Sequence, residues 1–135
     1  MKRPRSIAEI AERASLLQQE FDPAVREFVD SWQSMAAAER EGALAAEPVE
    51  LGGVKDAYIA AVAEYLAAID GRQAPTWTEK PGRFLHEPFF AGGLESLKAI
   101  LIAESPAAFR RRLIFVSADA LSRPRRAFVE TDFAR

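Results

Sequence analysis

The sequence predicts an all-α fold: a single compact helical bundle of five to seven helices that spans residues 1–135. Two observations carry this prediction. Apolar residues recur at helical spacing along most of the chain, and serine, proline and glycine stand where the helices should begin and end. With 135 residues and 49% apolar content, the chain is long enough for one domain with one hydrophobic core.

The first two helices are predicted from their starts. Ser6 and Glu9 form a capping box, in which each side chain reaches backbone N–H groups at the helix start, so a helix should run over about 7–20. Asp22 and Pro23 fit the N-cap and first helical position of a second helix. The apolar stripe that this second helix should bury consists of Val25, Phe28, Val29 and Trp32.

Two further helices should follow. The second helix should end near Ser34, and an alanine-rich third helix over 35–46 should end before Pro48. The longest helix should cover about 54–69, with Gly71 as its C-terminal cap. The residues that this helix should turn inward are Val54, Tyr58, Ala61, Val62, Tyr65, Leu66 and Ile69.

Residues 72–93 are predicted to form an ordered loop. The segment is rich in proline and glycine and also carries Trp77, Phe84, Phe89 and Phe90. Such aromatic density favours packing over disorder. We expect at most one helical turn in this loop, near 82–86.

The C-terminal third alternates between clear and ambiguous signals. A helix is expected over 94–104, and Ser105 with Pro106 repeats the N-cap and first-position pattern of a short helix. Residues 113–116 fit either an extended segment or a helix continuation, and their Ile, Phe and Val content favours the extended form. A last short turn is expected over 117–121.

Charge is distributed unevenly along the chain. Residues 1–5 carry +3 and residues 106–135 carry +4, whereas residues 6–105 carry −9, for a formal net charge of −2. The predicted molecule is therefore an acidic body with basic tails at 1–5 and 123–135. A basic end can hold a phosphate, a carboxylate or the chain's own acidic helices.

The composition excludes several kinds of chemistry. The chain has no cysteine and one histidine, His86, so neither thiol catalysis nor a zinc site is expected, and no cofactor is indicated. The acidic pairs Glu39/Glu41 and Asp56/Glu64 are interpreted as solvated helix faces rather than as metal ligands. Without a membrane-length apolar run or an apolar leader, we expect a cytoplasmic protein.

The arginines at 110–112 are the strongest candidates for a functional surface. Successive helical side chains diverge by about 100°, so Arg110, Arg111 and Arg112 cannot all enter one DNA groove, and at least one should face the body of the protein. They fit an internal ion-pair network with Glu95, Glu104 or another carboxylate, a contact with a protein, or a contact with nucleic acid. Because Trp and Arg anchor many interfaces, the predicted partner-binding residues are Arg110, Arg111, Arg112, Trp77 and Phe90.

Three segments of the chain resemble a small bacterial helical family of unassigned function. They are Thr76-Trp77-Thr78-Glu79, the stretch from Pro88 to Leu97, and the stretch from Glu104 to Val116 with its three arginines. The likeness covers about 54–122. The family is similar to antitoxins, is encoded beside a nucleotidyltransferase-like toxin, and in some members carries an N-terminal helix-turn-helix, which residues 1–50 do not match.

The sequence therefore predicts a non-catalytic, antitoxin-like module that binds and neutralises a partner protein. The alternative is a regulator that binds nucleic acid through its basic ends. A third possibility is a small enzyme that holds a phosphorylated or carboxylated metabolite through Arg110 or Arg111.

Overall fold

The computed structural model describes residues 2–90 and 104–116, and this part of the chain is mostly helical. The chain divides into two compact units, Met1–Leu51 and Gly52–Arg135. The single domain over 1–135 stays a prediction. The segments predicted over 94–103, 117–121 and 123–135 lie outside the described residues.

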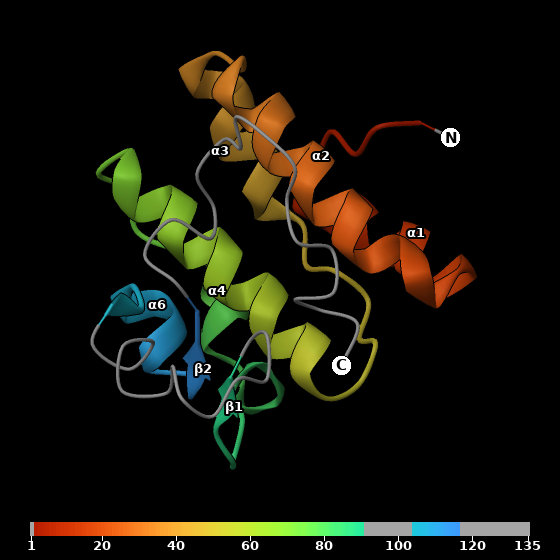
Figure 1. Cartoon of the computed structure of the whole chain (residues 1–135). Coiled ribbons are helices and arrows are strands. Elements are labelled where there is room, and N and C mark those ends of the chain that lie inside the picture. Colours follow the sequence, from red (N-terminus) through yellow and green to blue (C-terminus); the bar gives the residue numbers. More distant parts are fainter. Residues whose placement is uncertain (1, 91–103, 117–135) are drawn as a thin grey trace. The chain divides into compact units, whose positions relative to one another are not determined.

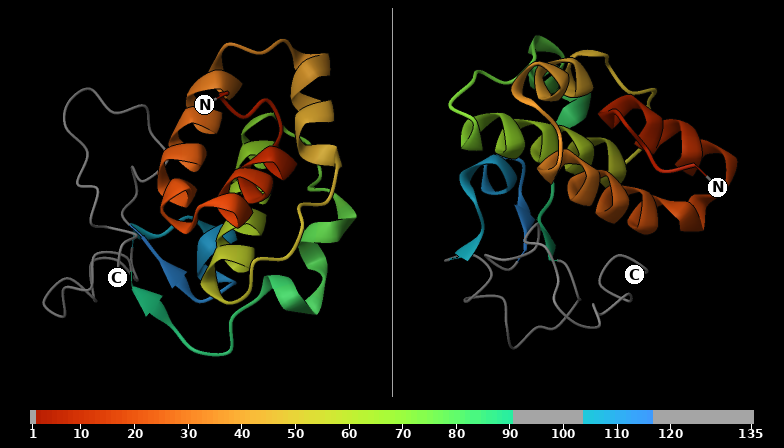
Figure 2. Two further views of the ribbon diagram at one scale, coloured as in Figure 1. Left: turned by 90° about the vertical axis from the view of Figure 1, so that its right-hand side faces the viewer. Right: turned by 90° about the horizontal axis from the view of Figure 1, so that it is seen from above.

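The first unit contains three α-helices and a short 3₁₀ helix. These are α1 (Ile7–Leu16), η1 (Gln18–Glu20), α2 (Phe21–Gln33) and α3 (Ala37–Ala45). Helix α1 packs against both α2 and α3. Figures 1 and 2 show α1 and α2 side by side in the red-to-orange part of the ribbon.

The start of α1 confirms the predicted cap, but its end does not follow the prediction. The Ser6 side chain accepts a hydrogen bond from the Glu9 amide at 3.3 Å, and the Glu9 carboxylate accepts one from the Arg5 amide at 2.7 Å. The helix ends at Leu16 rather than near 20. The following residues tighten into η1, which leads directly into α2.

The predicted start of α2 is wrong. The helix begins at Phe21 after Glu20, which makes no side-chain cap, so Asp22 is already helical. Pro23 falls at the third helical position, where its missing N–H has no acceptor within the helix in any case. Phe21 is only 4% exposed, and burial of this ring favours a helix that starts two residues earlier than predicted.

The apolar stripe of α2 is confirmed, and its C-terminal end is closed by α3. Val25, Phe28, Val29 and Trp32 are all buried. Arg40 of α3 donates hydrogen bonds to the Trp32 and Gln33 carbonyls at 3.1 and 3.3 Å. Its guanidinium also lies 4.9 Å from the centre of the Trp32 ring. A cation at this place satisfies the last carbonyls of α2 and complements the helix dipole.

The longest helix of the second unit has the predicted bounds. It is α4 (Val54–Ile69), preceded by Gly52 and Gly53 at φ values of 94° and 67°. Gly71 takes a φ of 69°, and the Arg72 amide donates to the Ala67 carbonyl at 2.9 Å. Glycine adopts this left-handed conformation without strain, so it marks both ends of the helix.

Helix α4 is buried over more of its surface than the predicted stripe. Ala57, Ile59 and Ala60 are 0% exposed although the stripe left them out. Ile69, which we expected to face inward, is 60% exposed and is the last residue of the helix. Helix α6 (Ala107–Arg110), η2 (Thr76–Glu79) and η3 (Pro81–Arg83) all pack against α4.

The remaining elements of the second unit form a small parallel sheet. Strands β1 (Phe89–Phe90) and β2 (Ile114–Phe115) pair with Phe89 opposite Ile114, and both lie near α6 in Figure 1. The predicted extended form is thereby confirmed for Ile114 and Phe115, whereas Leu113 lies in a turn. The loop contains the two 3₁₀ turns η2 and η3 instead of one turn near 82–86, and β1 was not predicted.

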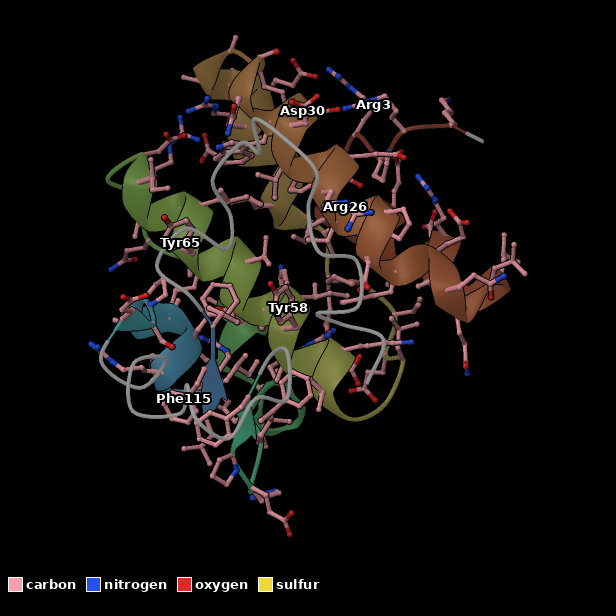
Figure 3. The ribbon with its side chains drawn as sticks, viewed as in Figure 1. Arg3, Arg26, Asp30, Tyr58, Tyr65 and Phe115 are labelled. Atoms are coloured by element: carbon pink, nitrogen blue, oxygen red, sulfur yellow. The ribbon has the colours of Figure 1, made fainter. Side chains whose placement is uncertain are left out.

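Aromatic side chains join α6 to α4. Phe109 is 0% exposed, and its ring lies 5.1 Å from that of Tyr58 and 6.2 Å from that of Tyr65, both in edge-on geometry. Figure 3 shows the two tyrosines at separate positions along α4, seven residues and thus about two turns apart. Edge-to-face contacts of this kind fix the direction of a short helix that has few hydrogen bonds of its own.

The predicted N-cap at Ser105 is wrong. Ser105 is 2% exposed, and its hydroxyl donates to the Val116 carbonyl at 2.9 Å and accepts from the Val116 amide at 2.8 Å. The N-cap of α6 is Pro106, which has no side-chain cap. Through these two hydrogen bonds Ser105 holds the two ends of the segment 105–116 together, and it does not cap a helix. Within it Leu113 takes a φ of 65°, a left-handed conformation that is strained for a branched side chain.

Candidate functional site

The five residues predicted to bind a partner lie in the second unit, at different depths. Arg110 is exposed, and the Arg111 side chain is 42% exposed. Arg112 is 0% and Trp77 is 5% exposed, so these two side chains present almost no surface to a partner. Phe90 is half-buried. The structure thus separates exposed arginines from residues that hold the unit together.

Arg112 is surrounded by acceptors from four segments. Its guanidinium donates to the Glu64 carboxylate at 2.5 Å, to the Ala108 carbonyl at 2.9 Å, to the Thr78 carbonyl at 2.8 Å and to the Arg83 carbonyl at 3.1 Å. Arginine has five N–H donors in a planar fork, so one side chain can serve several carbonyls at once. Arg112 therefore ties α4, η2, η3 and α6 together.

Burial changes the acid–base properties of Arg112. Loss of water around the guanidinium lowers its pKa, and the Glu64 carboxylate acts in the opposite direction. The group remains charged at neutral pH because arginine does not lose its proton in proteins. A buried charge of this kind depends on its partners, because removal of Glu64 would leave the Arg112 guanidinium without its close carboxylate.

Arg111 is held at the surface of the same cluster. It donates to both oxygens of the Glu79 carboxylate, at 2.9 and 3.0 Å, and to the Glu64 carboxylate at 2.8 Å. The guanidinium groups of Arg111 and Arg112 lie 5.2 and 4.5 Å from the centre of the Phe84 ring. The hydrogen bond to Arg111 lowers the pKa of Glu79, and the same bond raises the pKa of Arg111.

Arg110 differs from the two arginines that follow it. Its side chain is exposed and makes no hydrogen bond or ion pair with residues 2–90 or 104–116. The internal ion-pair network is therefore confirmed for Arg111 and Arg112, with Glu64 and Glu79 as the carboxylates. Glu95, one of the partners suggested by the sequence, lies outside the described residues.

A second buried arginine, Arg83, was missed by the sequence analysis. It is 1% exposed, and its guanidinium lies 5.0 Å from the centre of the Trp77 ring and 3.7 Å from the Asp56 carboxylate. Asp56 also accepts a hydrogen bond from the Gly52 amide at 2.8 Å. The interpretation of Asp56 and Glu64 as a solvated helix face is wrong, because each carboxylate compensates a buried arginine.

Phe90 belongs to a stacked aromatic pair. Its ring and that of Phe115, labelled on β2 in Figure 3, have centroids 5.0 Å apart and planes 22° apart. The pair lies across the register of β1 and β2. Offset stacking of this kind stabilises a two-stranded sheet that is too short to be stable by itself.

The basic N-terminal segment contacts acidic residues of its own unit. Arg3 donates to the Asp30 carboxylate at 2.7 Å and to the Ser31 hydroxyl at 3.3 Å, and Figure 3 shows Arg3 directed at Asp30. Arg5 forms an ion pair with Glu39. Among the options that the sequence left open for this end, the structure shows contact with the chain's own acidic helices.

Potential metal ligands do not gather in the described part of the chain. Residues 2–90 and 104–116 contain no cluster of three or more histidine, aspartate or glutamate side chains that could hold a metal ion. His86 is exposed in the loop between η3 and β1. No helix among the described residues is long and apolar enough to cross a membrane.

Comparisons with protein-family models, curated proteins and solved structures found no match for this chain. The geometry of the arginine cluster, formed by Arg110, Arg111 and Arg112 with Glu64 and Glu79, is therefore the basis for a function. Within it, Arg112 and Glu64 hold the fold, while Arg110, Arg111 and Glu79 remain open to solvent. These three exposed residues are the candidate binding surface.

Proposed function

We propose that this chain is a non-catalytic protein-binding module that neutralises a partner protein by covering part of its surface, as the antitoxin-like family it resembles would do. The observation that carries the proposal is the contrast within three consecutive arginines. Arg112 fixes the backbone from inside, so Arg110 and Arg111 are presented at the surface on a rigid support. Arginines held in this way are common anchors of protein interfaces.

The distribution of the other charges supports binding rather than chemistry. Asp56 and Glu64, the two carboxylates of α4 that contact buried arginines, neutralise Arg83 and the Arg111–Arg112 pair. General acid–base catalysis needs a titratable group aimed into a site. His86, the sole histidine, lies instead on an exposed loop.

The alternative of nucleic-acid binding receives less support. Affinity for phosphates depends on cations that are available to replace counterions. Arg3 and Arg5 already pair with carboxylates of their own unit, and residues 6–105 carry −9. An extended phosphate backbone would be repelled over most of this surface.

Co-expression with the product of the adjacent gene tests the proposal. We expect the two proteins to elute together in size-exclusion chromatography, and we expect this chain to restore growth if its neighbour is toxic. Arg110→Glu should weaken the complex, whereas Lys2→Glu, which reverses an exposed charge in the first unit, should not. Two separately eluting species together with no rescue of growth would contradict the proposal.

A further inference from the structure

The ion pair between Arg111 and Glu79 is the exposed member of the arginine cluster. The two side chains are 42% and 53% exposed, whereas those of Arg112 and Glu64 are 0% and 23% exposed. Exposed pairs contribute little to stability, since water solvates both charges well once they separate. Glu79 also lies 3.9 Å from the Arg112 guanidinium, but Arg112 keeps its close carboxylate, Glu64, and its three carbonyl acceptors when the Arg111–Glu79 pair opens.

Arg111 has supports that do not involve Glu79. Its guanidinium donates to Glu64 at 2.8 Å and lies 5.2 Å from the centre of the Phe84 ring. Both supports would hold the guanidinium plane in place if Glu79 moved away. The edge that Glu79 now occupies contains Nη1 and Nη2, which together bind a carboxylate through two parallel hydrogen bonds.

We propose that Glu79 is an internal stand-in for a carboxylate of the partner, and that the surface formed by Arg110 and Arg111 binds an acidic segment of a protein. This inference rests on the proposed function and names the chemistry of the partner. On binding, a partner carboxylate replaces Glu79 on the outer edge of Arg111. Arg110, the neighbouring exposed cation, contacts a second acidic residue of the same segment.

Carboxylates fit this surface better than a phosphate backbone does. The exchange replaces one carboxylate by another at the same two nitrogens, so the charge next to Glu64 does not increase. A nucleic acid would bring a continuous row of charges against the −9 of residues 6–105. A short acidic peptide segment can bind through two arginines and leave that region untouched.

The test compares two substitutions that remove the same charge from the second unit. A fluorescein-labelled peptide of alternating Glu and Gly is titrated at low salt with the full chain, and binding is followed by fluorescence anisotropy. Glu79→Gln should tighten binding by roughly two- to fivefold, because an exposed ion pair no longer competes for Arg111. Glu87→Gln, on the exposed loop before β1, should change the affinity much less.

Two further variants locate the effect at the arginines. Arg110→Gln should weaken binding of the peptide severalfold. Arg111→Lys keeps the charge but loses the paired hydrogen bonds, so adding Glu79→Gln to it should bring a smaller gain than in the native chain. Thermal unfolding of each variant shows whether a change in affinity reflects loss of structure instead.

Equal effects of Glu79→Gln and Glu87→Gln would overturn the inference, as would tighter binding of single-stranded DNA of matching length than of the peptide. Absence of peptide binding by both the native chain and the Glu79→Gln variant would overturn it as well.

A co-expressed partner that stays bound when Arg110 is replaced would refute the acidic-segment inference and leave the protein-binding function standing. Binding of the peptide in place of Glu79 at Arg111, without any co-eluting partner, would support the acidic-segment inference and contradict the proposed protein-binding function.

Discussion

Both units of this chain bury arginine side chains, and the N–H donors of Arg13 in the first unit and of Arg112 in the second unit have different partners. Arg13 of α1, 9% exposed, contacts two carboxylates, Glu20 and Glu27, each at 2.7 Å. Arg112, 0% exposed, has one close carboxylate, Glu64, and three backbone carbonyls. The pKa of Arg13 is raised, chiefly by its hydrogen bond to Glu27, whereas burial lowers the pKa of Arg112.

The difference follows from the secondary structure around each arginine. The segments near Arg13 are mostly helical and satisfy most of their own carbonyls, so Arg13 needs only to neutralise charge. Around Arg112 the chain makes short turns, which leave carbonyls at Thr78, Arg83 and Ala108 available. An arginine can therefore replace regular secondary structure as a source of hydrogen-bond donors.

The largest effect is expected for Arg112→Met. Loss of the guanidinium leaves the Thr78, Arg83 and Ala108 carbonyls without their buried donor, while Glu64 keeps only Arg111 as its partner. The free energy of unfolding should therefore fall by about 3–5 kcal/mol. Urea denaturation measures this change, and Arg110→Met, on the exposed neighbour, serves as the control with an effect within about 0.5 kcal/mol. Equal effects of the two substitutions would show that Arg112 does not hold the second unit together.

Arg13→Met should have a smaller effect. Glu20 and Glu27 are 24% and 32% exposed, so water can solvate them after Arg13 is lost. We expect a decrease of roughly 1–2 kcal/mol in the free energy of unfolding. Hydrogen exchange should become faster in α1 and α2, whereas Arg112→Met should affect 76–84 and 105–116. An effect of Arg13→Met as large as that of Arg112→Met would remove the distinction between the two sites.

Acid should weaken both clusters. Arg13 and Arg111 lower the pKa values of Glu27 and Glu79 below the ordinary 4.5. The folded state thus favours the charged carboxylates. Their contribution to stability is complete above the ordinary pKa and is lost as the pH falls through the lowered value. Glu27→Gln and Glu79→Gln should each flatten part of the decline measured between about pH 7 and pH 3. An unchanged acid profile in either variant would contradict this assignment.

The smallest effect on stability is expected for Glu79→Gln at neutral pH. The Arg111–Glu79 pair is exposed on both sides, so its loss should lower the free energy of unfolding by about 0.2–1 kcal/mol. The urea midpoint of this variant should stay close to that of the native chain. A loss as large as that of Arg112→Met would show that Glu79 is a structural partner and not an exchangeable one.

The sequence predicted the elements that are stabilised by interactions between residues close together in the chain. The bounds of α4 were foreseen because glycines flank a long apolar segment, and the Ser6 cap because its partner is three residues away. Strand β1 was missed because its two residues pair with Ile114 and Phe115, far along the chain. The N-cap at Ser105 was misread because the hydroxyl finds a partner at Val116.

In the candidate site, too, the sequence predicted some features and missed those that depend on residues distant in the chain. The sequence predicted that the arginines at 110–112 face different directions, since consecutive residues on a helix diverge. It did not reveal that Arg112 is buried and that Arg110 and Arg111 are exposed, nor that Arg83 is buried as well. No pattern around Arg83 distinguishes a buried arginine from a solvated one. Arg83 is buried because η3 packs against α4, where the guanidinium meets Asp56 and the Trp77 ring.

By itself the sequence determined the bounds of α4, the cap at Ser6, the apolar stripe of α2, and that positive charge is concentrated at the two ends of the chain. These properties follow from backbone conformation and side-chain spacing, which act over a few residues. The tertiary structure alone decided that Glu64 meets an arginine 48 residues away in sequence. Ion pairs of this kind form only after packing removes water from both charges, because the strength of the attraction depends on that burial.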